Sequence, residues 1–416
     1  MKNYILPLIC FFLFSLNINA QSDISSPYSM YGIGKVSPNY FAGLSAMGNT
    51  GIAYSTAFNI NKTNPASLTS IPKSSFLYEV GFNNTFSTKK TNNINQQNFD
   101  FSFTHIAMGL TINDYWSTSF GILPYSKVNY EIDVLQPVEG TTASYNTNVT
   151  GSGGITEVFW ANGFKLSNNF SVGLEIAGKF GSIDQEQYIN LGATSAYIKK
   201  STNYFSASLN TGFQYKLNDL LGHNTTLGAT ITTPSTYSGA ETLEGSKTLA
   251  NLGEIPISFE FDDDPQDIET PFKLGIGLTT NLNKNLLVNI DFRKNYWGST
   301  NKTFSTVSYV DQTIYALGVE FKPSTEYSNY WNKVKYRAGI NYDSGYLNLS
   351  NNDIDSYTFS LGLGMPISKN GLSTMNINYS YGKEGTINNE LVQDNFHKLS
   401  LNLSLFGNWF KKQKIF

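Results

Sequence analysis

The sequence predicts an all-β protein, a 14-stranded antiparallel transmembrane β-barrel with an N-terminal hatch in its lumen. Only 14% of the 416 residues are charged, whereas 40% are hydrophobic and 14% are aromatic; soluble domains usually carry about 25% charge. No uninterrupted apolar run of about 18 residues follows residue 20, which argues against a transmembrane helix. Repeated runs with a period of two, joined by alternately short and long connections, then favour a barrel in a bacterial outer membrane.

The overall charge and the aromatic content exclude two other classes of protein. The chain has 28 Lys and Arg against 31 Asp and Glu, a net charge of −3, and a nucleic-acid partner would call for a basic stripe. With 29 Phe and 26 Tyr, the chain has far more aromatic side chains than a disordered protein can leave unburied. The expected surroundings are therefore outer-membrane lipid, with no nucleic acid.

The first twenty residues have the layout of a secretory signal peptide. Lys2 is the short basic start, Tyr4–Leu16 is the apolar stretch, and Ala20 is a small residue at the cleavage point. The apolar stretch is too short for a transmembrane helix. Cys10, the single cysteine, would leave with the signal peptide. The mature protein is therefore expected to be exported to the outer membrane of a Gram-negative cell, without disulfides or thiol chemistry.

Residues 21–74 do not alternate with a period of two and are rich in Gly and Pro. Fourteen strands enclose a lumen too wide for side chains alone to fill, wider than that of an eight-stranded barrel. This segment is therefore predicted to fold into the lumen as a hatch, or plug. A separate periplasmic domain is the alternative.

From Ser75 onward, runs of alternating apolar and polar residues predict strands with one face against an apolar phase. The clearest run has Leu at 399, 401, 403 and 405, separated by polar residues. The runs are about twice as long as sandwich strands of about 5–6 residues, which favours a barrel over a soluble sandwich. The expected strands are 75–86, 99–112, 116–130, 153–166, 170–182, 201–217, 225–238, 270–282, 286–298, 305–321, 333–345, 355–367, 372–384 and 395–408.

The connections between the expected strands define a topology. Short turns such as 113–115 and 167–169 are typical of the periplasmic side, and long loops are typical of the external side. The long connections are 87–98, 131–152, 183–200, 239–267 and 385–394. An even number of strands predicts that both ends of the mature chain lie in the periplasm. The barrel is expected over 75–410, followed by a periplasmic C-terminal tail at 411–416.

Two irregularities interrupt the alternation. The apolar phase of the strand 99–112 slips near Thr104 and His105, which predicts a β-bulge. In the next strand, Pro124 stands within the run and cannot donate a backbone hydrogen bond to a neighbour. The wall is therefore expected to kink there and to open towards the lumen or a ligand, unless Pro124 lies beyond the bilayer. The residues of this kink are Gly121, Leu123, Pro124 and Tyr125.

The strand phase also predicts which side chains face the lumen. One inward set is apolar and, together with hatch residues, would line a pocket for an apolar ligand; the alternative is that these residues pack the hatch against the wall. This candidate pocket consists of Phe41, Met47, Phe58, Leu77, Phe159, Leu287 and Ile314. A second inward set is charged and is expected to pin the hatch. These lumen charges are Glu175, Lys179, Asp291, Arg293, Lys335 and Arg337.

Several short segments carry a family resemblance. Asn64–Ser67 reads Asn-Pro-Ala-Ser and follows the small-residue stretch Ala46–Ala53, and Gly121–Tyr125 reads Gly-Ile-Leu-Pro-Tyr. These segments resemble the FadL/TodX family of outer-membrane transporters for hydrophobic compounds, and Ser26–Gly34 is similar to the opening of a Bacteroidota branch. The resemblance implies a fourteen-stranded barrel whose hatch motif is Asn64, Pro65, Ala66 and Ser67.

The resemblance also implies a function. A small hydrophobic molecule, such as a long-chain fatty acid or an aromatic hydrocarbon, would be captured near 131–152 and 183–200. It would then leave sideways through the kink by passive diffusion. The alternative is a non-transporting FadL-like subunit of a larger outer-membrane complex, for secretion or barrel assembly, with other outer-membrane proteins as partners. The sequence contains no catalytic constellation and no metal-ligand spacing, so no enzyme activity, metal or cofactor is expected.

Overall fold

The computed structural model describes residues 26–37, 40–137, 140, 144–192, 194–220, 222–249, 253–257, 267–300, 307–323 and 329–408. The expected signal peptide (1–20) and C-terminal tail (411–416) lie outside these residues. Among the described residues, no helix is both long enough and apolar enough to cross a membrane.

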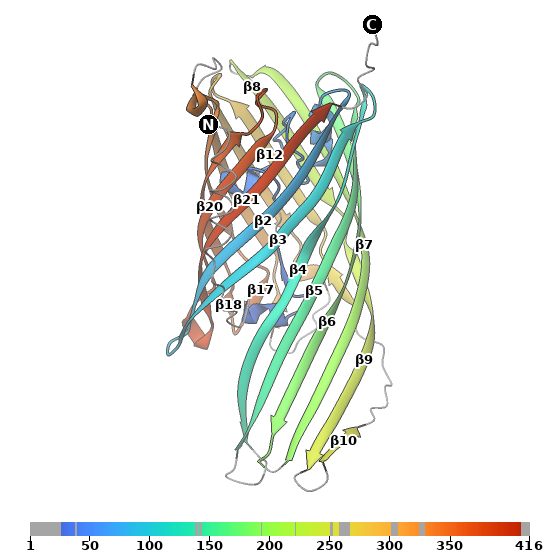
Figure 1. The fold of residues 1–416 in the computed structure, drawn as a ribbon, viewed down its shortest axis with the longest axis vertical. Helices are drawn as coiled ribbons and strands as arrows, with labels where there is room; N and C mark the ends of the chain where they lie inside the picture. Colours follow the sequence, from blue (N-terminus) through green and yellow to red (C-terminus); the bar gives the residue numbers. More distant parts are fainter. Residues whose placement is uncertain are drawn as a thin grey trace.

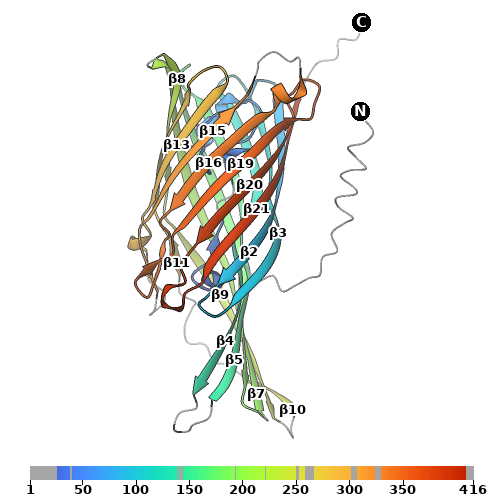
Figure 2. The ribbon, with the colours of Figure 1, turned by 90° about the vertical axis from the view of Figure 1, so that its left-hand side faces the viewer.

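Antiparallel strands form the wall, and the last strand pairs with the first, so the sheet closes (Figures 1 and 2). The wall has the fourteen strands that the sequence predicts, with boundaries that differ by a few residues inside the barrel. The strands are β2 (Ser75–Lys90), β3 (Asn95–Thr111), β4 (Trp116–Pro137), β5 (Ser144–Lys165), β6 (Phe170–Asn190), β7 (Thr194–Leu220), β8 (His223–Thr232), β12 (Lys273–Asn281), β13 (Leu286–Asn295), β15 (Gln312–Phe321), β16 (Lys335–Asp343), β19 (Ser356–Pro366), β20 (Thr374–Glu384) and β21 (Gln393–Asn408).

The two faces of the wall reverse the usual arrangement of a soluble protein. Large apolar side chains on the outer face are exposed, including Trp160 at 53% and Leu361 at 61%. Polar side chains on the inner face are buried, including Glu79, Asn376 and Ser404, each at 0% exposure. This pattern requires an apolar phase outside the wall, as for a strand that faces lipid.

Short elements complete the described chain. β9 (Ser235–Leu249) continues β8 after Pro234, and β11 (Ile268–Thr270) precedes β12 across Pro271. The remaining elements are η1 (Pro27–Met30), β1 (Lys35–Val36), η2 (Leu44–Met47), η3 (Pro65–Ser70), β10 (Gly253–Ile257), η4 (Trp297–Ser299), β14 (Val307–Tyr309), η5 (Tyr330–Lys333), β17 (Leu347–Leu349), β18 (Asn352–Asp353) and η6 (Asn388–Glu390).

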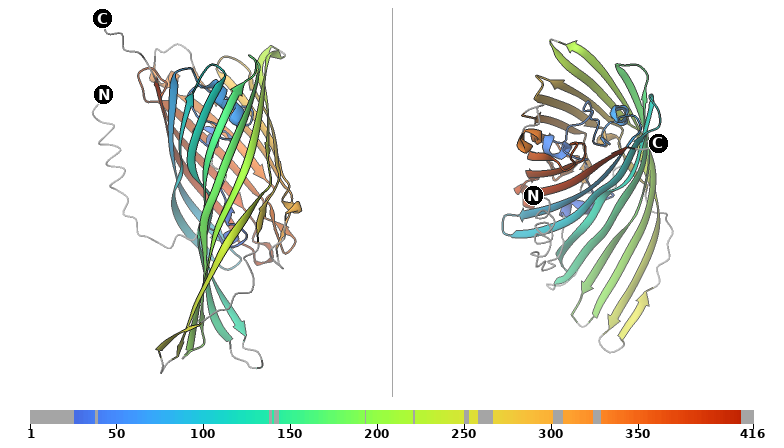
Figure 3. Two further views of the ribbon diagram at one scale, coloured as in Figure 1. Left: turned by 90° about the vertical axis from the view of Figure 1, so that its right-hand side faces the viewer. Right: turned by 45° about the horizontal axis from the view of Figure 1, so that its top comes forward.

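β21 ends at one end of the barrel, and at the other end a sheet projects far beyond the wall (Figures 1 and 3). This projecting sheet is formed by β4, β5, β6, β7, β9 and β10. The pairing of β4 with β5 runs to Pro137↔Ser144, and that of β6 with β7 runs to Asn190↔Ser195. The prediction that 87–98, 131–152, 183–200 and 239–267 are loops is therefore wrong for most of their described residues. Within these ranges, 138–139, 141–143, 193, 250–252 and 258–266 lie outside the described residues. On β4, the outward positions of the projection begin with the acidic residues Glu131 and Asp133, but the backbone pairing continues.

The first described residues lie at the end of the barrel opposite to Asn408, the last described residue. Ser26 donates its backbone N–H to Asn129 O (3.3 Å), and the Tyr28 hydroxyl donates to Val392 O (2.6 Å). Val392 directly precedes β21, at the end of the barrel opposite to Asn408. The predicted ends of the mature chain, at residues 21 and 416, lie outside the described residues. The chain enters from the projecting end, passes through the lumen and reaches β2 at the other end.

Candidate functional site

Residues 26–74, here called the N-terminal segment, lie against the inner face of the wall around most of its circumference. β1 pairs with β4, η2 contacts β15, β16, β19 and β20, and η3 contacts β4, β5, β6 and β7. Between these contacts, Ile60 and Asn59 reach Glu79 of β2. The segment is thus attached to the wall from several directions.

The Asn-Pro-Ala-Ser motif forms the start of η3 and is completely buried. The Asn64 side-chain Oδ1 accepts the Ala66 N–H (3.0 Å), an N-cap that satisfies a free backbone donor. Its Nδ2 donates to Ile52 O (2.7 Å) within the segment and to Phe213 O (3.1 Å) on β7. Asn64 therefore shapes the turn and also fixes it to the wall.

Wall glycines allow the N-terminal segment to approach the strand backbones closely. A Cβ at Gly173 of β6 would lie 2.2 Å from Ala66 N and 2.3 Å from Pro65 C. A Cβ at Gly339 of β16 would lie 2.0 Å from Gly48 N. These are backbone atoms, which cannot give way as the end of a flexible side chain does. The segment and the wall are therefore complementary in shape at these positions.

This complementarity predicts the effect of adding one methyl group. We expect Gly173→Ala to destabilise the folded barrel by about 1–3 kcal/mol, the usual cost of overpacking, because the backbone of η3 must move. Gly178→Ala, on the same strand, is the control, since its Cβ would meet no atom within 4 Å. Urea titration of folded against unfolded protein on gels measures both variants. Equal stability of the two variants would contradict the close contact of η3 with β6.

Lys62 of the N-terminal segment lies between two wall carboxylates. Its Nζ is 2.7 Å from Glu157 Oε1 and 3.0 Å from Glu175 Oε1, and both carboxylate side chains are at most 5% exposed. Lys179 Nζ is 3.9 Å from Glu157 Oε2. Burial alone would lower the pKa of the Lys62 ammonium, but the two carboxylates hold this pKa above its ordinary value. Lys62 therefore stays charged and paired at any physiological pH.

A second group of charges holds residues 49–52. Asp291 Oδ2 accepts the backbone N–H groups of Gly51 (2.8 Å) and Ile52 (3.1 Å), and it pairs with Arg293 (2.8 Å). Arg293 also donates to Tyr40 Oη and Asn49 O. Hydrogen bonds that involve ionised groups are about twice as strong as neutral ones, so this contact fixes the segment firmly to β13.

The last pair of expected lumen charges forms its ion pairs with a wall carboxylate rather than with the N-terminal segment. Lys335 Nζ lies 3.1 Å from Glu320 Oε1, and Arg337 Nε lies 2.8 Å from Glu320 Oε2. The Arg337 guanidinium also lies against Gly43, where a Cβ would meet its nitrogen at 2.1 Å. Of the six charges expected to pin the hatch, Glu175, Asp291 and Arg293 bond to the segment, whereas Lys179, Lys335 and Arg337 pair with wall carboxylates.

The residues expected to form one apolar pocket are divided among several places. Phe41, Leu77 and Phe159 are each at most 1% exposed and share a packed cluster in which the Phe41 ring stacks on His105 at 3.7 Å. Met47 and Leu287 belong to a second cluster. Phe58 contacts Phe406, and Ile314 belongs to none of the described clusters.

These clusters leave almost no space for a ligand. Beside Phe41, Leu44 and Met47 the free volume is only about 10 Å³, which accommodates at most one water molecule. The apolar residues therefore pack the N-terminal segment against the wall, the alternative that the sequence left open.

The wall has a gap between β3 and β4. The two strands pair from Thr111↔Ser117 only to Ile106↔Ile122. Tyr125 is an extra residue opposite β5, and Thr104 is an extra residue opposite β2. Trp116 O accepts a hydrogen bond from Ile112 N (2.9 Å), so the backbone groups of Trp116 face β3. Every second residue of a strand faces the same neighbour, so the backbone of Pro124 also faces β3. Proline has no N–H to donate there. Leu123 and Tyr125 point inward and are buried, whereas Pro124 lines the cavity behind the gap.

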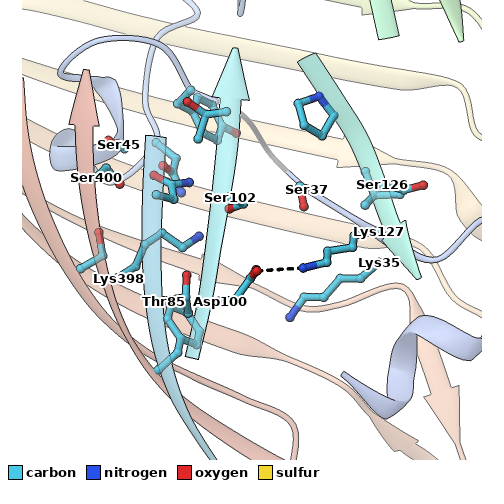
Figure 4. Close-up of a pocket in the computed structure, with 18 of the residues that line it drawn as sticks. Lys35, Ser37, Ser45, Thr85, Asp100, Ser102, Ser126, Lys127, Lys398 and Ser400 are labelled. Carbon is cyan, nitrogen blue, oxygen red and sulfur yellow. Dashed lines mark hydrogen bonds and ion pairs between the residues drawn. The ribbon is translucent and has the colours of Figure 1, made fainter. Parts of the chain in front are cut away.

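A cavity of about 630 Å³ lies behind this gap (Figure 4). Lys127 Nζ of β4 spans the gap to Asp100 Oδ1 of β3 at 2.8 Å, and Lys35 pairs with Glu384. The labelled side chains around the cavity are polar or charged: Lys35, Ser37, Ser45, Thr85, Asp100, Ser102, Ser126, Lys127, Lys398 and Ser400. Apolar and aromatic side chains also line the cavity, among them Phe82, Phe103, Ile155, Leu347 and Phe396. The space beside the gap is thus mixed in character and holds charged groups, whereas a binding site for a hydrocarbon is mainly apolar.

Sequence reasoning did not identify Lys62, Glu157 or Glu79 as site residues. Glu157 and Glu79 share the inward phase of Phe159 and Leu77, so the strand pattern contained a signal for both. Lys62 has no such signal, because its partners are 95 and 113 positions away in the sequence. Among the described residues, no group of three or more His, Cys, Asp or Glu side chains is placed to hold a metal ion.

Solved structures share this fold. The P. putida toluene transporter TodX matches with a TM-score of 0.60 and 16% identity over 90% of this chain and 99% of that chain. A Pseudomonas aeruginosa FadL homologue matches with a TM-score of 0.59 and 14% identity over 91% and 100%. The Ralstonia pickettii toluene transporter TbuX matches with a TM-score of 0.57 and 13% identity over 88% and 98%.

The structural matches establish a FadL-type outer-membrane barrel fold. TodX and TbuX are toluene transporters, and a further match, CymD, is a monoaromatic hydrocarbon channel. Among curated protein sequences, none matches this chain. A model of one protein family, BamG, matches residues 1–416, the whole chain. The chain therefore belongs to the BamG family.

Proposed function

We propose that this barrel is a non-transporting subunit of a larger outer-membrane complex, and that the N-terminal segment is a fixed hatch. The observation that carries this proposal is the way the segment is held. Buried ion pairs at Lys62, charged hydrogen bonds at Asp291 and Arg293, and backbone contacts at wall glycines surround it. A hatch that must shift in each transport cycle would have to break these contacts together.

The filled interior supports the same proposal. An apolar ligand would need an apolar cavity of a few hundred cubic ångströms, but the apolar clusters are closed, and the larger cavity, whose lining is mixed, holds the charged groups of Lys35, Asp100 and Lys127. A barrel whose interior is occupied can still offer its outer wall and its projecting sheet to other proteins.

The β3–β4 gap supports a second candidate function, a channel for small hydrophobic molecules. The pairing of β3 with β4 ends at Ile122, and Pro124 lines the cavity behind this gap. The FadL homologue and the two toluene transporters share this fold. In such a channel, ligand would leave the lumen sideways through the gap.

Uptake measurements distinguish the two functions. We expect cells with and without the protein to take up labelled fatty acid and toluene at equal rates, because the hatch does not move. A channel would give faster uptake in wild-type cells. Pro124→Ala would then reduce uptake, because alanine restores an N–H towards β3 and favours closure of the gap. A reproducible loss of uptake in cells that lack the protein would overturn the subunit proposal.

A further inference from the structure

One edge of the projecting sheet has no partner strand in the described part of the chain. β4 is paired with β5 along its whole length to Pro137. On its other side, β3 stops pairing at Ile122, and β1 takes over only at Ser126 and Lys127. The last described hydrogen bond with the N-terminal segment is at Asn129, and Met30 packs against the cluster that contains Tyr130. The edge from Glu131 to Leu135 is then free of described partners.

The backbone groups of this edge point outward in a regular pattern. Asn129 accepts the Ser26 N–H on its carbonyl (3.3 Å) and donates its own N–H to Ser29 Oγ (3.1 Å). Both groups of Asn129 thus face away from β5. Because strand residues alternate and the β4–β5 register is unbroken here, the N–H and C=O groups of Glu131, Asp133 and Leu135 face the same way.

The side chains beside this edge differ between its two faces. One face is acidic: Glu131 and Asp133 both accept hydrogen bonds from Asn148 Nδ2 (3.2 and 2.9 Å) and have no described ion pair. In the paired register, Glu186 and Glu244 lie in the same row as Glu131, with Lys199 between them. The opposite face is apolar, with Ile132 and Val134 on β4.

This apolar face continues across the sheet. Ile132 pairs with Val149, which joins Tyr130 and Ile183 in a buried cluster. A strand added to the β4 edge would extend this cluster on one face and would meet the carboxylates on the other. Its side chains would therefore have to alternate between aliphatic and basic residues, because opposite charges on neighbouring strands stabilise a sheet and like charges destabilise it.

We propose that the β4 edge from Glu131 to Leu135 accepts an extended segment of a partner protein by β-strand addition, and that this segment alternates basic and aliphatic residues. A second copy of this chain does not fit, since antiparallel pairing of two such edges would bring Glu131 and Asp133 close to their own copies. The opposite edge of the sheet, β10, is short and carries Pro256, which protects an edge from pairing. The proposal rests on the proposed subunit function and locates one contact.

The chain itself already uses this edge for strand addition. β1 pairs with β4 through Lys35↔Lys127 and Val36↔Ser126, and Ser37 N donates to Tyr125 O (2.9 Å). β1 thus supplies one basic and one aliphatic residue to the inner part of the edge. An incoming strand would continue this pairing outward.

A peptide-binding experiment tests the proposal on the full-length protein in detergent. The probe is a short fluorescent peptide of alternating lysine and valine, with an alternating glutamate and valine peptide as the control. Asp133→Pro removes one edge N–H and leaves the β4–β5 ladder intact, because that N–H faces away from β5. Asp133→Asn retains the N–H and removes the charge. We expect the lysine peptide to bind in a salt-dependent manner, with about tenfold weaker binding to Asp133→Pro.

Each outcome decides the proposal. Binding that is weakened by Asp133→Pro, weakened less by Asp133→Asn, and absent for the glutamate peptide supports it. No binding of the lysine peptide, equal binding of both peptides, or binding unaffected by Asp133→Pro overturns it. Wild type and Asp133→Pro are also purified from native membranes, and the partners that copurify are compared. This comparison distinguishes failure of the edge proposal from failure of the proposed subunit function. If both retain the same partners, the edge proposal fails alone; if wild type has no partner, the subunit function fails.

Discussion

Lys62→Met is expected to release the hatch from the wall. The substitution retains most of the side-chain volume but leaves the Glu157 and Glu175 carboxylates buried without their shared cation. Removal of one partner from a buried ion pair usually costs about 3–5 kcal/mol. We therefore expect rapid cleavage of the N-terminal segment by added protease, and a lower free energy of unfolding in urea titration.

The matched control is Lys73→Met, in the same segment. Lys73 pairs with Asp114 at 2.9 Å, but both side chains are more than 60% exposed, and exposed pairs contribute at most about 1 kcal/mol. A rescue variant, Lys62→Met with Glu157→Gln and Glu175→Gln, removes the buried charges and should restore most of the protease resistance. Equal protease sensitivity of Lys62→Met and Lys73→Met would contradict the role of Lys62 as the main anchor.

Deletion of residues 21–72 is expected to turn a closed barrel into an open pore. The lumen wall is polar where the segment covers it, as at Glu79, Asp291 and Asn376, so water and ions should fill the vacated space. In a planar lipid bilayer, the full-length protein should not raise the conductance above the baseline, whereas the deletion variant should give discrete, stable conductance steps. This change is the largest functional effect that the structure predicts.

Folding of the deletion variant has to be shown independently. Folded barrels migrate differently on gels before and after heating, which reports insertion without reference to conductance. A folded deletion variant with baseline conductance would contradict the assignment of the segment as the plug. If the variant does not fold, Lys62→Met combined with Asp291→Asn supplies the same test, because it loosens two anchors and retains the whole chain.

The strand pattern was sufficient to predict the barrel and many of its inward residues. Apolar residues on every second position placed Glu175, Asp291 and Arg293 in the lumen, and the slip of phase near Thr104 predicted the bulge that the β2–β3 register contains. These features are local, because a strand has a fixed period of two and a change of face needs an extra residue.

The projecting sheet and the anchoring of the hatch were not predictable in the same way. In the projection, Glu131 and Asp133 take the outward positions that Phe120 and Ile122 take in the barrel, and Ile132 and Val134 lie on the other face, so the phase of the apolar pattern changes although the strand continues. The pairing of Lys62 with Glu157 and Glu175 depends on the path of a segment without regular periodicity. Packing of Phe41 on His105, rather than an open pocket, also depends on how completely that segment fills the lumen.

The composition of the particle purified from native membranes tests the central claim most directly. After extraction in a mild detergent, native mass spectrometry measures the mass of the intact particle and identifies its components. We expect a stable complex with fixed stoichiometry that contains this barrel and at least one other outer-membrane protein, with no bound hydrophobic ligand. A single copy of the chain that carries an acyl chain or an aromatic hydrocarbon inside the barrel would contradict the account and favour a channel.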